Sequence, residues 1–78
     1  MKFKDLKAGE RAVVVGVTGD GPVRKRLLDL GLTRGVEIVL VRVAPLGDPI
    51  EIELRGFRLT VRKDETDIVE LERCEVRE

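Results

Sequence analysis

The sequence predicts one small, mainly β domain: a five-stranded barrel with a single α-helix inserted between its first and second strands. Three observations support this fold class. Short β-branched or alternating segments recur between glycine and proline breakers. One segment alone has helical spacing. The 78 residues form one domain, residues 1–78, with a thin core, because a chain this short buries only about 60% of its unfolded surface.

The chain opens with a short lead-in, residues 3–10, in which Phe3 and Leu6 can cover the bottom of a core. Residues 11–18 are rich in valine, which is β-branched and favours strands, so we expect the first strand there. Gly16 lies inside this segment. A mid-strand glycine indicates a bulge or a tight bend of the kind that barrel corners need.

One helix is expected at residues 22–30, after a turn and N-cap at residues 19–21. Proline at the first helical position suits a helix start. Apolar residues then recur at helical spacing: Val23, Leu27, Leu28 and Leu30. Gly31 is placed to end the helix in the left-handed conformation.

Four further strand regions follow. Residues 36–43 are apolar on both faces, so we expect the helix to cover the second face. Residues 50–55 and 57–62 each alternate apolar with polar side chains, and their outer charges are opposite in sign, which favours a hairpin. Residues 68–71 form a last short strand, and residues 72–78 form a charged tail.

Five strands in so short a chain must curl and nearly close, because a flat sheet would leave one face bare. A small SH3-like barrel satisfies this requirement with the helix between strands one and two. The competing five-stranded arrangement, the OB-fold, usually has its helix between strands three and four. The position of the helix therefore favours the SH3-like barrel.

The side chains that enzymes use most often are missing. The chain contains no His and no Ser, and Cys74 has no His partner, so we expect no catalytic residues and no enzyme. A single cysteine also excludes an intrachain disulfide and a soft-metal site. The acidic residues Asp64, Glu65 and Asp67 are read as a solvated turn in preference to a hard-cation site.

The charges are balanced: 15 Lys and Arg against 15 Asp and Glu, for a formal net charge of zero. This balance, with Tyr and Trp absent, argues against nucleic-acid binding. No apolar run approaches the roughly 20 residues of a membrane helix, and the first residues lack the apolar stretch of a signal peptide. We therefore expect a soluble, cytoplasmic protein. Its high charge and lack of Asn and Gln suggest a thermophilic source.

Two surface segments are candidates for binding. The basic cluster at residues 24–26 is either a solvated helix face or a docking patch for an acidic partner. The loop at residues 44–50 contains two prolines and is therefore stiff. It either presents Leu46 outward as an apolar contact or folds Leu46 back to plug the barrel end.

Four segments, in order and at natural spacing, resemble the FeoA family: residues 26–32, 35–38, 44–50 and 55–59. The resemblance covers nearly the whole chain. It implies an SH3-like barrel and a cytoplasmic accessory protein of ferrous iron uptake that acts on the GTP-binding membrane transporter FeoB. The same module occurs at the C-terminus of DtxR-type regulators. With no helix-turn-helix segment in the sequence, the free-standing version is expected.

From this resemblance and the surface segments we expect a partner-binding surface with two parts. The residues are Arg24, Arg26 and Asp29 on the helix, and Pro45, Leu46 and Asp48 in the loop. No metal site and no cofactor are expected, and weak binding of Fe²⁺ or another divalent cation, like homo-oligomerisation, stays open. The alternatives are a regulatory domain of a metal-dependent transcriptional regulator system and a nucleic-acid-binding small barrel.

Overall fold

A computed structural model of the chain describes residues 1–74. Its elements, in order, are the 3-10 helix η1 (Phe3–Asp5), β1 (Arg11–Val17), α1 (Pro22–Asp29), β2 (Glu37–Val43), β3 (Ile50–Leu54), β4 (Phe57–Val61), the 3-10 helix η2 (Glu65–Ile68) and β5 (Val69–Arg73). The last strand starts one residue later than predicted and runs two residues into the expected charged tail. Residues 75–78 of that tail lie outside the described part.

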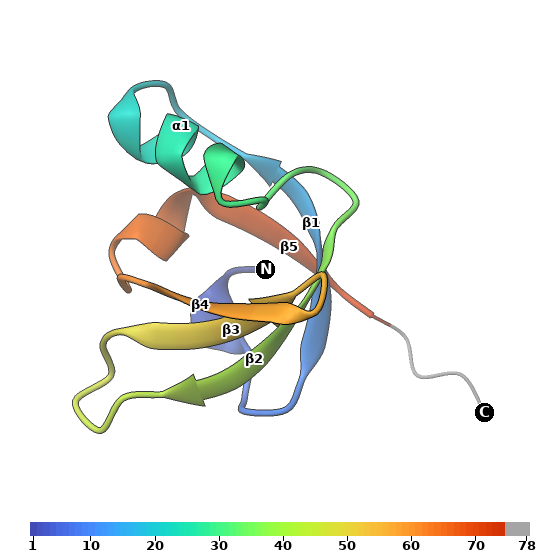
Figure 1. Cartoon of the computed structure of the whole chain (residues 1–78), viewed down its shortest axis with the longest axis vertical. Helices are drawn as coiled ribbons and strands as arrows, with labels where there is room; N and C mark the ends of the chain where they lie inside the picture. Colours follow the sequence, from blue (N-terminus) through green and yellow to red (C-terminus); the bar gives the residue numbers. More distant parts are fainter. Residues whose placement is uncertain (75–78) are drawn as a thin grey trace.

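The five strands form one antiparallel sheet in the order β4-β3-β2-β1-β5, which curls around the core (Figure 1). The described strands leave the two ends of this order, β4 and β5, unpaired with each other, so the curled sheet stays open on that side. The predicted fold class, five strands with one helix between the first and second, is confirmed. Phe3 and Leu6 of the lead-in are buried in the core, as expected.

The register contains two irregularities. The pairing of β1 with β5 shifts between Val14 and Gly16, which confirms the predicted bulge. A second shift, between Leu40 and Arg42 on β2, has no glycine to mark it and no counterpart in the sequence expectations. Both irregularities lie on long strands that pair on two sides, where a bulge increases the twist that a small curled sheet requires.

The end of α1 is built by Gly31, whose φ of +109° suits glycine, as predicted. The Gly31 N–H donates to the Leu28 carbonyl at 3.0 Å, and the Leu32 N–H donates to the Leu27 carbonyl at 3.1 Å. These two bonds form a Schellman motif. A Cβ at Gly31 would lie 3.0 Å from Leu54 Cδ1, so the helix end lies directly against β3.

The start of α1 confirms the N-cap expected within residues 19–21. Gly21 occupies the N-cap position, and no side chain caps the helix there. Pro22 is the first helical residue, as predicted, and the helix ends at Asp29, one residue early.

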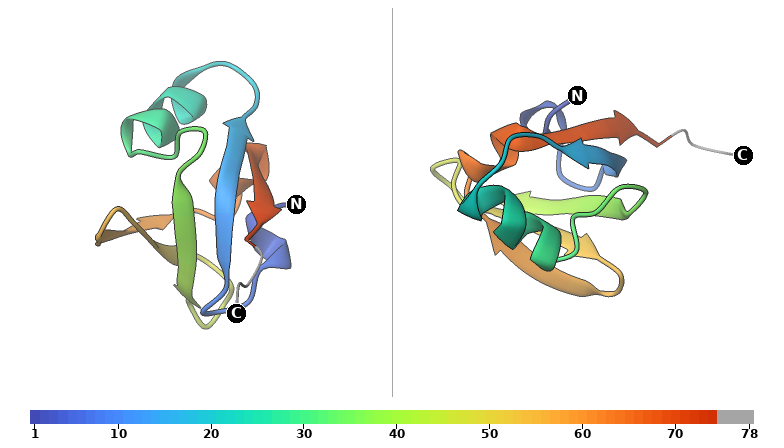
Figure 2. Two further views of the ribbon diagram at one scale, coloured as in Figure 1. Left: turned by 90° about the vertical axis from the view of Figure 1, so that its right-hand side faces the viewer. Right: turned by 90° about the horizontal axis from the view of Figure 1, so that it is seen from above.

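The helix is anchored by one side chain rather than by an apolar stripe. Leu27 is fully buried, but Val23 is 40% exposed and Leu30 is 37% exposed. Figure 2 shows the reason: α1 lies at one end of the curled sheet and does not lie flat against a strand. The expectation that it covers the second face of β2 is wrong, and Val43 on that face is exposed.

Phe57 also departs from its predicted place. The alternating pattern assigns it to the half-buried face of β4 with Leu59 and Val61. Val61 is buried and Leu59 is half-buried, but Phe57 is 54% exposed. Phe57 pairs with Leu54 directly beside the hairpin turn, where the sheet ends and little remains to cover a large side chain.

Candidate partner-binding surface

The helix residue Arg26 is tied to the segment between β4 and β5. Its guanidinium forms an ion pair with Glu65 of η2. The other Glu65 oxygen, Oε1, accepts a hydrogen bond from the backbone N–H of Arg62 at 3.2 Å. The Glu65 carboxylate therefore connects Arg26 of α1 to Arg62, the residue that follows β4.

The loop residue Asp48 is tied to the same region. Its Oδ1 accepts a hydrogen bond from the backbone N–H of Lys63 at 2.8 Å, and the peptide bond from Asp48 to Pro49 is cis. Arg26 and Asp48 consequently line one cavity, together with Thr60 and Glu65. The structure thus brings together one predicted residue from the helix and one from the loop, although they lie 22 positions apart in the sequence.

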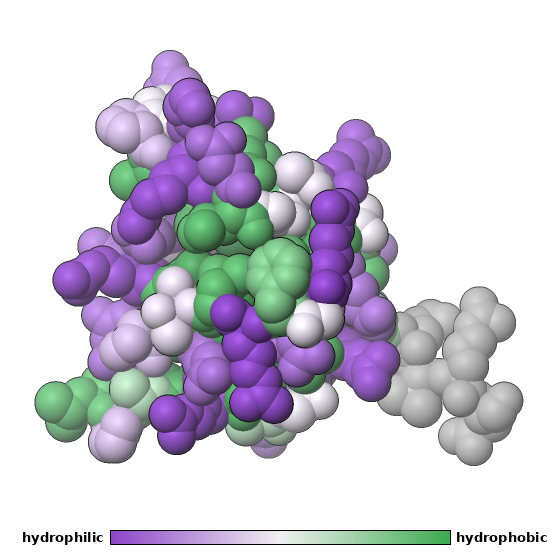
Figure 3. Space-filling model, viewed as in Figure 1, coloured by the Kyte–Doolittle hydropathy of each residue, from purple (hydrophilic) through white to green (hydrophobic). Residues whose placement is uncertain are grey.

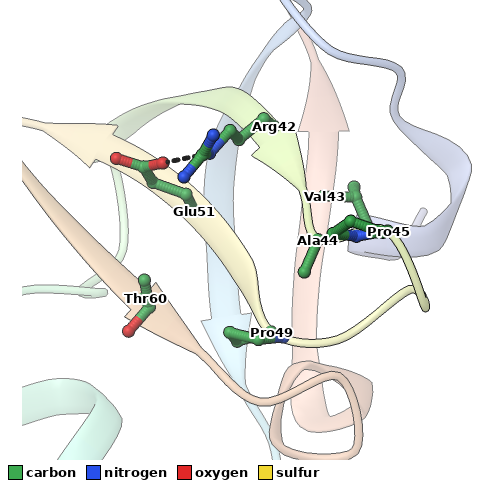
Figure 4. Close-up of a pocket in the computed structure, with 7 residues that line it drawn as sticks. All are labelled: Arg42, Val43, Ala44, Pro45, Pro49, Glu51 and Thr60. Atoms are coloured by element: carbon green, nitrogen blue, oxygen red, sulfur yellow. Dashed lines mark hydrogen bonds and ion pairs between the residues drawn. The ribbon is translucent and has the colours of Figure 1, made fainter.

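A second cavity adjoins the first and shares Pro49 and Thr60 with it. Figure 4 shows its walls: Pro45 and neighbouring loop residues on one side, and an ion pair between Arg42 and Glu51 on the other. The distance from Arg42 Nε to Glu51 Oε1 is 2.9 Å. We call the two adjoining cavities the loop groove. It runs from Arg26 on α1 to Pro45 in the loop.

Leu46 lies at the tip of this loop and is 97% exposed. The turn beneath it is closed by two backbone hydrogen bonds, from the Gly47 N–H to the Ala44 carbonyl at 2.7 Å and from the Ala44 N–H to the Pro49 carbonyl at 3.0 Å. Of the two alternatives for Leu46, the structure has the outward one. The loop presents an apolar side chain to solvent on a backbone that is already ordered.

Arg24 and Asp29 do not line the loop groove. Arg24 is half-buried, and its Nε donates to the Val17 carbonyl at 3.0 Å, which ties the helix to the end of β1. Asp29 is exposed and pairs with Lys25 one helical turn earlier, at 3.2 Å. Both residues have local structural partners, and their partner-binding role stays a prediction.

Sequence reasoning missed Thr60 and the structural role of Glu65. Thr60 belongs to the outward face of an alternating strand, and nothing in its neighbours marks it. The sequence groups Glu65 with Asp64 and Asp67 as a solvated turn, but Glu65 is half-buried and bound to Arg26. Within residues 1–74, no group of three acidic, Cys or His side chains is arranged to hold a metal ion.

The single thiol is in an inert environment. Cys74 Sγ lies 3.5 Å from Glu37 Oε2. Burial, followed by the hydrogen bond and charge of Glu37, raises the pKa of the Cys74 thiol above its ordinary value. A thiol that stays protonated at neutral pH is a poor nucleophile.

Comparison with known proteins identifies the domain. The family model described as "FeoA domain" matches residues 1–73. A curated relative, the Fe(2+) transport protein A/Fe(2+) transporter FeoB fusion protein of Porphyromonas gingivalis, is 35% identical over 72 residues. That match covers 92% of this chain but only 8% of the relative, so the chain spans less than a tenth of the fusion protein.

Solved structures agree. The FeoA protein from Chlorobium tepidum is 45% identical, with a TM-score of 0.88, over 100% of this chain and 74% of that one. The FeoA of Stenotrophomonas maltophilia, described as an SH3 domain protein complexed with zinc, is 26% identical with a TM-score of 0.79. That match covers 92% of this chain and 89% of the other.

The likeness to an SH3 domain protein confirms the SH3-like fold predicted from the position of the helix. The family model covers residues 1–73, and the solved structures share the fold across nearly the whole chain. This chain belongs to the FeoA domain family.

Proposed function

We propose that this protein is a cytoplasmic accessory protein that docks on a FeoB-type GTP-binding membrane transporter and tunes its uptake of ferrous iron. One observation carries the proposal. In Porphyromonas gingivalis, a protein containing a segment similar to this chain is a fusion of Fe(2+) transport protein A with FeoB. Fusion keeps two modules at a high effective concentration, which is useful when the two act together.

Docking also requires affinity from the surface of the domain itself. The loop groove and the exposed Leu46 suit this task. Leu46 is a preordered apolar side chain, and an apolar anchor surrounded by polar groups is the usual centre of a protein interface. Arg26 and Asp48 lie on the groove wall and supply charges of both signs.

The domain reaches the membrane through its partner in this proposal. No helix in residues 1–74 is long and apolar enough to cross a bilayer. The cytoplasmic, GTP-binding part of the transporter is therefore the surface on which we expect it to dock.

The test is binding of the purified protein to the cytoplasmic domain of FeoB, with and without guanine nucleotide. We expect Leu46→Ala to weaken binding about 5- to 30-fold, the effect of losing an interface contact of about 1–2 kcal/mol. Because Leu46 contributes almost nothing to the core, the thermal unfolding midpoint of the Leu46→Ala variant should equal that of the native protein.

The matched control is Val15→Ala, which trims another exposed aliphatic side chain, on β1 and outside the loop groove. It should bind as the native protein does. Arg26→Glu is a poorer probe of binding, because Arg26 forms an ion pair with Glu65 and the new glutamate would place a second carboxylate beside Glu65. Equal binding by the native protein and Leu46→Ala would remove the loop from the docking surface.

A further inference from the structure

The two edge strands of the sheet, β5 and β4, differ in whether another part of the chain bonds to their outer side. On the β5 edge, the amino group of Met1 donates to the Leu71 carbonyl at 2.9 Å, and the Leu71 N–H donates to the Met1 carbonyl at 2.8 Å. Lys2 adds an ion pair with Glu70. The N-terminal residues thus cover the middle of that edge, at Leu71. On the other edge, β4 has β3 as its one strand partner among the described residues.

The geometry of the hairpin shows which backbone groups β4 leaves free. Its turn has two residues, Arg55 and Gly56, with φ of 50° and 85°, which makes a type I′ turn. The flanking pair, Leu54 and Phe57, then exchanges both ladder hydrogen bonds, and the pattern alternates from there. The N–H and C=O groups of Arg58 and Thr60 therefore point away from β3, toward the uncovered edge.

No other backbone group in residues 1–74 bonds to Arg58 or Thr60. By contrast, the next outward position is closed: the Arg62 N–H donates to Glu65, and the Arg62 carbonyl accepts from the Glu65 and Thr66 N–H groups. The free edge is thus a short, defined row of donors and acceptors, ended on one side by the hairpin turn and on the other by η2.

An apolar surface accompanies this edge. Phe57 and Leu59 lie on the same face of β4, where Phe57 is exposed and Leu59 is half-buried. Leu30, at the end of α1, is also exposed. The contact of Gly31 with Leu54 brings the helix end beside the hairpin. In the space-filling view, an apolar patch fills the region between α1 and β4 (Figure 3). A strand added beside β4 would cover this patch with every second side chain.

The charges along the edge are basic. β4 contains Arg58 and no acidic residue, and Arg55 and Arg62 flank it. Arg58 pairs with Glu53 at a long 3.5 Å, whereas Arg55 and Arg62 have no ion pair in the described chain. A second copy of β4 would bring the same arginines and no carboxylate, so like charges would meet across the new ladder. An acidic strand is the complementary occupant.

We propose that the free edge of β4 is a strand-addition site for an extended peptide of a partner protein in which acidic and apolar residues alternate. The peptide bonds to the N–H and C=O groups of Arg58 and Thr60. Its apolar side chains cover Phe57 and Leu59, and its carboxylates lie beside Arg58 and Arg62. Such β-augmentation takes its affinity from main-chain bonds and its specificity from alternate side chains. The site does not include Leu46, but it shares Thr60 and Arg62 with the lining of the loop groove, and it does not depend on which protein supplies the peptide.

The test is amide hydrogen exchange on the ¹⁵N-labelled protein, with a decapeptide of alternating glutamate and valine as the probe. We expect exchange at the Arg58 and Thr60 amides to slow about tenfold at saturating peptide, which corresponds to one net backbone hydrogen bond. The Leu59 amide already bonds to β3, so its exchange should not change. A decapeptide of alternating lysine and valine should have no effect.

Two variants separate the backbone from the side chain. Thr60→Pro removes the outward N–H while leaving every bond to β3 in place, a position where an edge strand tolerates proline. It should abolish the response at Arg58. Thr60→Val keeps the N–H and should respond as the native protein does. Arg62→Glu, which leaves the backbone intact, should reverse the preference toward the lysine peptide.

Three results would overturn the proposal. The first is an equal response to the glutamate and lysine peptides. The second is shifts at the loop of Leu46 with no protection at Arg58 and Thr60. The third is protection of these two amides by protein concentration alone, which would assign the edge to a second copy of the chain.

Discussion

Replacing Gly31 by alanine tests how tightly the helix end is fitted to the sheet. Two costs are expected. A φ of +109° strains any residue with a Cβ, by about 1–3 kcal/mol. The new Cβ would also lie 3.0 Å from Leu54 Cδ1, and Leu54 is 1% exposed and cannot swing into solvent. Forcing an extra methyl into a filled core costs about another 1–3 kcal/mol.

Gly35→Ala is the matched control, because Gly35 has a similar φ of +90° but no atom within 4 Å of the point that a Cβ would occupy. It should show the backbone cost alone. The free energy of unfolding, measured by urea denaturation at constant m-value, should therefore fall at least about 1 kcal/mol further for Gly31→Ala than for Gly35→Ala. In thermal unfolding the same difference corresponds to roughly 4–8 °C.

Equal losses for the two alanine variants would refute this reasoning, because they would mean that Leu54 gives way without cost. A larger loss at Gly35 would refute it as well.

Three further predictions concern the core, the N-terminus and the thiol. Leu27→Ala should cost about 2–5 kcal/mol in urea denaturation, because Leu27 is fully buried, whereas Leu30→Ala should cost well under half of that. The hydrogen bond from Lys2 lowers the pKa of Glu70 in the folded protein. The interaction between Lys2 and Glu70 therefore stabilises the fold fully above the ordinary glutamate pKa of 4.5, and this stabilisation is lost as pH falls through the lowered pKa. Lys2→Ala should consequently lose less stability than the native protein between pH 6 and pH 3, and an identical acid profile would contradict this. Cys74 should react with a thiol reagent at pH 7 more slowly than free cysteine does, because burial raises its pKa, and a faster reaction would contradict the assignment.

Local patterns were enough to predict most of the fold. The alternation in residues 50–55 and 57–62 predicts the β3–β4 hairpin, and the glycines at 16 and 31 mark the bulge and the helix end. These features depend on neighbours a few positions away, because strand pleating, turn geometry and helix termination are short-range properties. The resemblance in four ordered segments likewise predicted the family, which the family match then confirmed.

Periodicity did not predict which apolar residues would be covered. Leu27 and Leu30 belong to one helical stripe, but α1 touches the end of a small curled sheet, and there is room there to bury one of them completely. Phe57 and Val61 alternate on one strand, but the sheet ends beside Phe57. The periodicity of apolar residues predicts the direction in which a side chain points. Whether that side chain is buried depends on how far the neighbouring element extends opposite it.

The candidate site was decided by the tertiary structure for the same reason. The sequence by itself indicated a basic helix and a stiff loop as separate surfaces. The pairing of Arg26 with Glu65 and of Asp48 with the Lys63 N–H, which joins them into one groove, spans 39 and 15 positions. The pairing of Met1 with Leu71 of β5 joins residues 70 positions apart. Contacts between distant positions form only when the whole sheet curls, and no local pattern records which distant partners that curvature brings together.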